Sequence, residues 1–186
     1  MSGRTKNVKD HRSHRIVGVA HCLLNQNAKV AGLASHRGVF APLIPLLQES
    51  GVGIIQLPCP ELVHLGPARP LGTDTVEQYD TSPYRAVCSE LARGAVAELC
   101  AYRDAGYEIP CVLGVEGSPS CSVSRVPRLL APDRSELRPG RGLFTEALVV
   151  ELRAAALQLP LLGIPESPET GDLAAALAEL RRHLGR

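Results

Sequence analysis

The chain has 186 residues, of which 45% are hydrophobic and 21% are charged, and its formal net charge is +1. This balance is typical of one folded globular domain and excludes a disordered chain, a collagen-like repeat and a long coiled coil. Apolar runs end before membrane-spanning length, and the basic N-terminus is not followed by the apolar segment of a signal peptide, so we expect a cytoplasmic protein without membrane contact.

Basic residues are concentrated at the N-terminus. Residues 1–15 contain five Lys or Arg side chains and one Asp, which leaves the rest of the chain slightly acidic. We therefore predict a basic, flexible arm over residues 1–14 and a single domain over residues 15–186. The arm could contact RNA phosphates, but the 3% of aromatic residues is too low for the stacking surfaces of single-strand binders.

Four short apolar runs predict buried β-strands, at residues 15–20, 51–57, 109–115 and 159–164. Each run is continuous rather than alternating, as in strands that helices cover on both faces. Helical patterns occupy residues 38–50, 82–105, 142–157 and 172–184, with Ser82 and Thr170 as expected caps. This order predicts an α/β fold, a small Rossmann-like three-layer domain with a four-stranded parallel sheet. Residues 122–141, which contain three prolines and five arginines, are expected to form a long loop or hairpin near the site.

Six cysteines occur in the chain, and no two of them form a Cys-x-x-Cys pair. This spacing argues against a zinc ribbon, a thioredoxin-type redox pair and a ferredoxin-type run of ligands. Cys22, Cys59 and Cys121 each follow a predicted strand, and the carboxyl ends of parallel strands meet at one edge of a sheet. We therefore expect these thiols to converge. The other three fall inside predicted helix or strand and are interpreted as small buried apolar residues: Cys88, Cys100 and Cys111.

Three converging thiolates suit either an iron–sulfur cluster with one iron free of protein ligands or a zinc ion completed by histidine or water. His21 and His64 are the candidate histidines, and we interpret both as locally hydrogen-bonded polar residues. A dinucleotide site is a poorer fit, because the first predicted strand runs into AHCL where Gly-x-Gly-x-x-Gly would be required.

The segments CLLN at Cys22, LPCPE at Cys59 and SPSC at Cys121, followed by GRGLFTEAL at residues 140–148, resemble the thiouracil desulfidase (TudS) family. The resemblance spans residues 16–164. It implies a Rossmann-like domain that holds a [4Fe-4S] cluster on Cys22, Cys59 and Cys121, with an unligated iron that takes sulfur from a thiolated base. The chain departs from the usual family pattern at Asn25 and Ser122, where the family has glycine.

An iron with an open position is a Lewis acid with affinity for sulfur, so the expected reaction converts C=S to C=O and releases sulfide. Three residues are candidate proton-transfer groups. Ser118 is the first serine of SPSC, where the resemblance implies a catalytic serine. Glu61 follows Cys59 by two positions and could instead form an ion pair with Arg69. Glu116 ends a buried strand, a position that favours acid–base function.

Asn25 and Arg69 are the candidate substrate-binding residues, since an amide can read the donor–acceptor edge of a base and a guanidinium can bind an anion. We expect a small thiolated substrate, such as thiouracil or a thiolated nucleoside, and tRNA is less favoured. Two alternative interpretations stay open at this point. One is a zinc-binding hydrolase or binding module, and the other is a non-catalytic iron–sulfur protein that senses redox state or sulfide.

Overall fold

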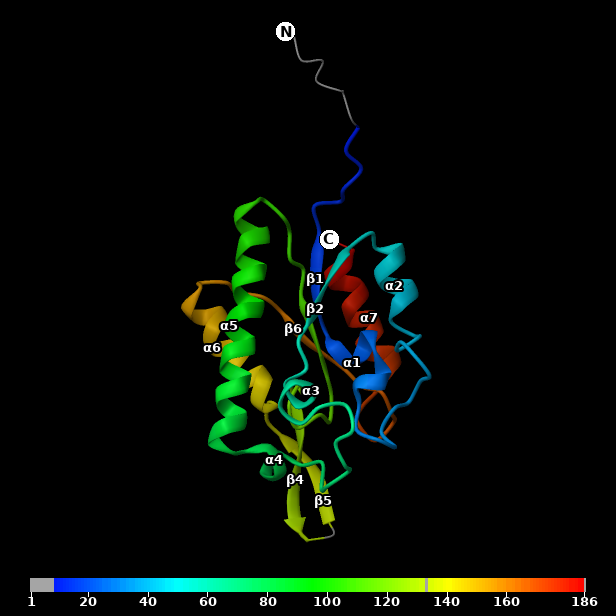
Figure 1. The fold of residues 1–186 in the computed structure, drawn as a ribbon. Helices are drawn as coiled ribbons and strands as arrows, with labels where there is room; N and C mark the ends of the chain where they lie inside the picture. Colours follow the sequence, from blue (N-terminus) through cyan, green and yellow to red (C-terminus); the bar gives the residue numbers. More distant parts are fainter. Residues whose placement is uncertain (1–8, 133, 186) are drawn as a thin grey trace.

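The computed structural model describes residues 9–132 and 134–185, and its centre is a parallel sheet (Figure 1). The strands lie in the order β2-β1-β3-β6, and every neighbouring pair is parallel. Their bounds are Ile16–Ala20 for β1, Gly53–Leu57 for β2, Val112–Val115 for β3 and Leu161–Ile164 for β6. The four predicted strands and the predicted α/β, three-layer, Rossmann-like class are therefore confirmed.

Helices cover both faces of the sheet (Figure 1). The long α5 (Ser82–Asp104) and α6 (Leu143–Ala154) pack against each other on one face. The other face carries α2 (Ile44–Glu49) and α7 (Leu173–Leu184). Four short helices connect these elements: α1 (His21–Leu24), η1 (Gln26–Ala28), α3 (Pro60–Leu65) and α4 (Val76–Tyr79). None of the helices in the described ranges combines the length and the apolar character needed to cross a membrane.

The hydrophobic core lies between the sheet and its two helix layers. All five residues of β1 are buried, because this strand has a neighbour on each side and helices above and below. Cys88 and Leu99 of α5 are buried on the face that the helical spacing predicts, and Cys111 is also buried. These two cysteines act as small apolar residues, as expected, and Cys100 packs at the edge of the same core.

Three local predictions are wrong at the helix ends. The helix expected from residue 38 begins at Ile44, because Pro42 would interrupt a helix interior whereas Pro45 is tolerated in the first turn. The cap of α5 is Thr81 rather than Ser82, and the cap of α7 is Asp172 rather than Thr170. In both cases the capping residue lies directly before the first helical residue, and its side-chain oxygen accepts a hydrogen bond from the backbone N–H three residues further along the chain.

Residues 122–141 contain an antiparallel hairpin of β4 (Arg125–Ala131) and β5 (Arg134–Pro139), one of the two forms predicted. The hairpin extends beyond the carboxyl edge of the parallel sheet, next to α4 (Figure 1). Glu77 of α4 holds it in place, since this carboxylate accepts hydrogen bonds from the Arg128 side chain (3.1 Å) and from the backbone N–H of Leu129 (2.9 Å).

The predicted basic arm is only partly covered, because residues 1–8 lie outside the described residues. In the part that the structure describes, the Arg12 guanidinium donates to the hydroxyl of Tyr107 (3.2 Å), and the His14 ring packs against the Tyr107 ring.

Candidate functional site

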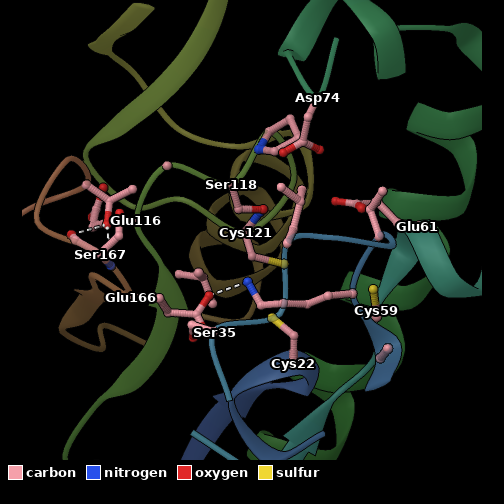
Figure 2. A pocket seen from close by; sticks show the side chains of 18 of the residues that line it. Cys22, Ser35, Cys59, Glu61, Asp74, Glu116, Ser118, Cys121, Glu166 and Ser167 are labelled. Carbon is pink, nitrogen blue, oxygen red and sulfur yellow. Dashed lines mark hydrogen bonds and ion pairs between the residues drawn. The ribbon is translucent and has the colours of Figure 1, made fainter. Parts of the chain in front are cut away.

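Cys22, Cys59 and Cys121 line one cavity of about 230 Å³ at the carboxyl edge of the sheet. Figure 2 shows their sulfur atoms turned toward the same space. The chain passes from β1 to β2 on one side and then returns to β3 on the other side of β1. This reversal of direction makes the edge between β1 and β3 the place where open α/β sheets bind ligands.

Each of the three cysteines is positioned by the local backbone. Cys22 lies in α1, which follows β1 directly. Cys59 is the N-cap of α3, and its sulfur accepts a hydrogen bond from the backbone N–H of Leu62 (3.4 Å). Cys121 lies in a loop that folds back on β3, where its carbonyl accepts from the N–H of Val115 (3.0 Å). A side chain at Gly114 would collide with that carbonyl, so glycine is required for the loop to approach the strand.

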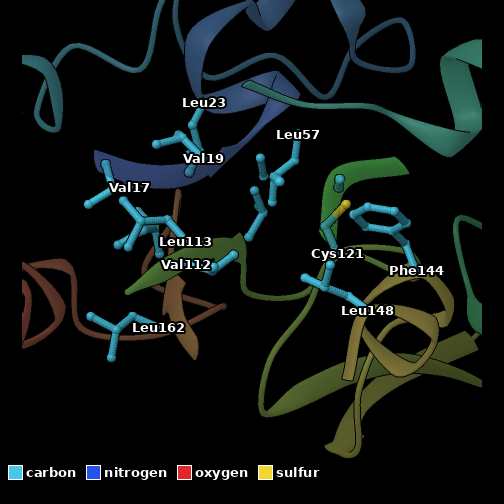
Figure 3. Close-up of a cluster of buried hydrophobic side chains, with 14 of the residues drawn as sticks. Val17, Val19, Leu23, Leu57, Val112, Leu113, Cys121, Phe144, Leu148 and Leu162 are labelled. Carbon is cyan, nitrogen blue, oxygen red and sulfur yellow. The ribbon is translucent and has the colours of Figure 1, made fainter. Parts of the chain in front are cut away.

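The start of α6 supports the loop that carries Cys121. The N–H groups of Leu143 and Phe144 donate to the carbonyls of Pro119 (3.0 Å) and Ser120 (2.9 Å). Figure 3 shows Cys121 beside Phe144 and Leu148. These N–H groups lie in the first turn of α6, which begins in the segment GRGLFTEAL. They hold the loop and so fix the position of the Cys121 thiol.

Burial controls the protonation of the three thiols. It raises the pKa of Cys22 to about 12, although Lys29 has an opposing effect. Burial also raises the pKa of Cys59, with a further contribution from the Glu61 carboxylate, and it raises the pKa of Cys121 well above its ordinary value. The three groups are therefore thiols at neutral pH unless a metal centre draws off their protons, as coordination does.

Three cysteine thiols are the type of ligand that binds an iron–sulfur cluster. Within residues 9–132 and 134–185, no three His, Cys, Asp or Glu side chains are gathered around one point closely enough to hold a single metal ion. A cluster instead takes its thiolates on separate irons, which suits thiols spread around a cavity. His21 contacts Gln56 through Nδ1 (3.0 Å) and His64 packs on the Tyr84 ring, so neither histidine joins the described residues that line the cavity.

Glu61 and Arg69 form a buried ion pair in the cavity wall, which confirms the structural pairing that the sequence suggests. Glu61 is 7% exposed and Arg69 is 4% exposed, and the Arg69 Nη2 lies 3.3 Å from the Glu61 Oε2. The hydroxyl of Ser120 donates to the other carboxylate oxygen (2.7 Å) and lies 2.6 Å from the Tyr84 hydroxyl. Arg69 Nε is buried and has no hydrogen-bond acceptor among the described residues.

Glu116 lines the cavity, but its carboxylate oxygens are occupied. They accept hydrogen bonds from the Ser122 hydroxyl (2.8 Å) and from the backbone N–H groups of Ser124 and Arg125 (3.1 Å each). The absence of a side chain at Gly163 leaves the space that this carboxylate fills. These contacts give Glu116 a structural role, in which it ties the end of β3 to the start of the hairpin.

Ser118 lines the cavity, and its oxygen accepts hydrogen bonds from the N–H groups of Ser120 (3.2 Å) and Cys121 (3.0 Å). Its own hydrogen stays available to a ligand. Asn25, by contrast, is not among the described residues that line the cavity. Its side-chain oxygen accepts from the N–H of Asn27 (3.1 Å) and caps η1.

Three charged residues in the cavity wall were missed by the sequence analysis: Lys29, Asp74 and Glu166. Lys29 pairs with Glu166, which also accepts from the Gln26 side-chain amide (2.6 Å). Burial lowers the pKa of Lys29, but Cys22 and Glu166 outweigh this effect and raise it overall. Glu166 lies two residues beyond β6, so the strand-end rule that selects the cysteines would also have found it. Asp74 lies in the irregular segment before α4, far from any strand, and had no such signal.

The chain is similar to one curated protein and to one solved structure. No protein-family model matches the chain. Among solved structures, the [4Fe-4S]-dependent thiouracil desulfidase TudS is similar over 89% of this chain and 99% of that chain, at 24% sequence identity and a TM-score of 0.47. The uncharacterized protein MJ0003 of Methanocaldococcus jannaschii is 38% identical over 112 residues, which cover 60% of this chain and 70% of that protein. The chain therefore belongs to the same protein family as MJ0003.

Proposed function

We propose that this protein is an iron–sulfur-dependent desulfidase that converts the C=S group of a small thiolated compound to C=O. One observation carries the proposal. Three thiols from three different strand ends line a single cavity together with hydroxyl, carboxylate and ammonium groups. The motifs around Cys22, Cys59 and Cys121 support it, because they resemble those of the thiouracil desulfidase family.

Cys22, Cys59 and Cys121 would hold a [4Fe-4S] cluster. When bound, this group would supply an iron without a protein ligand, which is a Lewis acid with affinity for sulfur. The buried Arg69 Nε, which lacks an acceptor in the described part of the chain, agrees with an occupant that carries an anion or a carbonyl oxygen.

The remaining residues are placed to bind and orient a small substrate. Ser118 can donate its hydroxyl hydrogen to a ligand, because its oxygen is already fixed by two backbone N–H groups. Glu61 is a carboxylate held in one orientation by Arg69 and Ser120, so it can accept an N–H of a thioamide. Because the cavity of about 230 Å³ would have to hold the cluster as well, it favours a free base or nucleoside over a larger molecule.

Anaerobic reconstitution followed by a substrate assay tests the proposal. We expect about four irons and four labile sulfides per chain, followed by release of sulfide with turnover from 2-thiouracil, 4-thiouridine or a related thioamide. Stoichiometric zinc without iron would favour the zinc hydrolase or binding module. A fully loaded cluster that leaves thioamides, thiolated bases and thiolated tRNA intact would favour the redox or sulfide sensor.

Ser118→Ala is expected to keep the iron content and to lower the rate of sulfide release by about a hundredfold, since it removes one hydroxyl from the reacting site. Ser124→Ala is the matched control, because Ser124 is exposed and does not line the cavity. The iron content and the rate are measured on the same preparation. If Ser118→Ala loses iron in proportion to its rate, the hydroxyl serves the loop that carries Cys121 and does not act on the substrate.

A further inference from the structure

The cavity wall contains four carboxylates, and three of them are held by hydrogen bonds described above: Glu61, Glu116 and Glu166. Asp74 differs from them. Its carboxylate takes one hydrogen bond, from the Tyr79 hydroxyl, and within the described residues it accepts none from a backbone N–H and pairs with no Lys or Arg side chain. Figure 2 shows Asp74 above Ser118 and Cys121, on the same side of the cavity as Glu61. It is therefore the lining carboxylate that is most available to a ligand.

The surroundings of Asp74 favour a carboxyl group that can gain and lose a proton near neutral pH. Burial and the neighbouring Glu61 raise the pKa of Asp74 to about 6. Three groups act in the opposite direction and lower it: Lys29, Arg69 and the hydroxyl of Tyr79. A carboxyl group with a pKa near the working pH exchanges protons most effectively with substrate and water.

The backbone at Asp74 is held in an uncommon conformation. Its φ is 49°, in the left-handed region that non-glycine residues rarely adopt. The side chain of Gln78 stabilises this conformation, because its oxygen accepts the N–H of Asp74 (2.8 Å). Gly72 leaves room for that side chain, since a Cβ at this position would overlap it. Non-glycine residues that a structure holds in the left-handed region are concentrated at functional sites.

We propose that Asp74 is a catalytic residue that carries a proton from the attacking water to the departing sulfur. This inference rests on the proposed desulfidase function. In the overall reaction, the water oxygen bonds to the thiocarbonyl carbon, the C–S bond breaks, and sulfur leaves as hydrosulfide with one water proton, while the other proton passes to solvent. No electrons are gained or lost. Asp74 takes one of the two protons as a carboxylate and returns it as a carboxylic acid.

The test compares Asp74→Asn with the wild-type protein, both carrying the reconstituted cluster. We expect an unchanged iron content, a loss of rate of about a hundredfold or more, and the disappearance of an acidic limb near pH 6 in the wild-type profile. The rate falls below this pH because the proton acceptor must be ionised. Asp74→Glu should recover part of the rate. Asp104→Asn, which removes an exposed carboxylate on α5, should retain the wild-type rate and profile.

A second readout does not depend on activity. The folded protein binds the Asp74 proton more tightly than the unfolded chain does, so Asp74 destabilises the wild type as the pH rises through 6. Asp74→Asn mimics the protonated form and should melt at a higher temperature at pH 7.5, by about 5 °C, with no difference near pH 4.

Two results would overturn the inference. If Asp74→Asn keeps a rate within about threefold of the wild type and retains the acidic limb, Asp74 is not the proton carrier, although the desulfidase function stands. If the loaded wild-type protein releases no sulfide from any compound in the panel, the proposed function fails and the role of Asp74 fails with it.

Discussion

Replacing Cys22, Cys59 or Cys121 by serine is expected to abolish cluster binding, so that the iron content after anaerobic reconstitution falls from about four per chain to near zero. Each thiol comes from a different strand end, and no other described cysteine lines the cavity. A serine hydroxyl is a poor substitute for a thiolate toward iron. The measurements are iron, labile sulfide and the visible absorption of the reconstituted protein.

The other cysteines supply the matched controls. Cys88→Ala and Cys111→Ala should retain the full iron content and lose only packing, about 1 to 2 kcal/mol in the free energy of unfolding. Both side chains are buried in the core, and neither lines the cavity. Normal iron loading in all three cavity variants, or loss of iron in Cys88→Ala alone, would refute the assignment of the ligands.

Arg69→Leu is expected to lower the free energy of unfolding of the cluster-free protein by about 3 to 5 kcal/mol, because it leaves the buried Glu61 without its counter-ion. Arg69 also donates to the carbonyl of Ala28 (2.6 Å), which the variant leaves without this donor. Denaturation by urea, with the midpoint and the slope compared between variants, measures the effect.

Arg85→Leu is the control for this loss, since Arg85 pairs with Asp80 at the surface and both side chains are well exposed. We expect it to cost about 1 kcal/mol or less. The double variant Glu61→Gln with Arg69→Leu should recover part of the stability, because no unpaired charge is then buried. Equal losses in the free energy of unfolding in Arg69→Leu and Arg85→Leu would show that the buried ion pair contributes no more to stability than the exposed one.

The strands were predictable because each is a continuous apolar run that helices cover on both faces. The long helices were predictable from apolar residues spaced by three and four positions. Helix ends were less predictable, because the capping residue is the one directly before the first residue with a helical backbone conformation. Thr81 precedes Ser82 and both are good capping residues, so the sequence does not decide between them.

The cavity thiols were predictable because the direction of a parallel strand decides which of its ends faces the site. Asp74 and Lys29 were not, because their positions depend on the paths of irregular loops. Asn25 shows a different difficulty. Side-chain amides next to a turn bind nearby backbone groups as readily as they bind a ligand, and here the backbone of η1 takes up that amide.

The cavity wall also determines when the site can be completed during synthesis of the chain. All three thiols have been made once translation reaches Cys121, but the loop that carries this residue is held by the first turn of α6. Glu166 and Ser167, which close another side of the cavity, follow β6 later still. A nascent chain that ends before these segments would therefore expose three thiols without a shaped site. If the proposed cluster binds here, its complete pocket therefore exists only after β6 has joined the sheet.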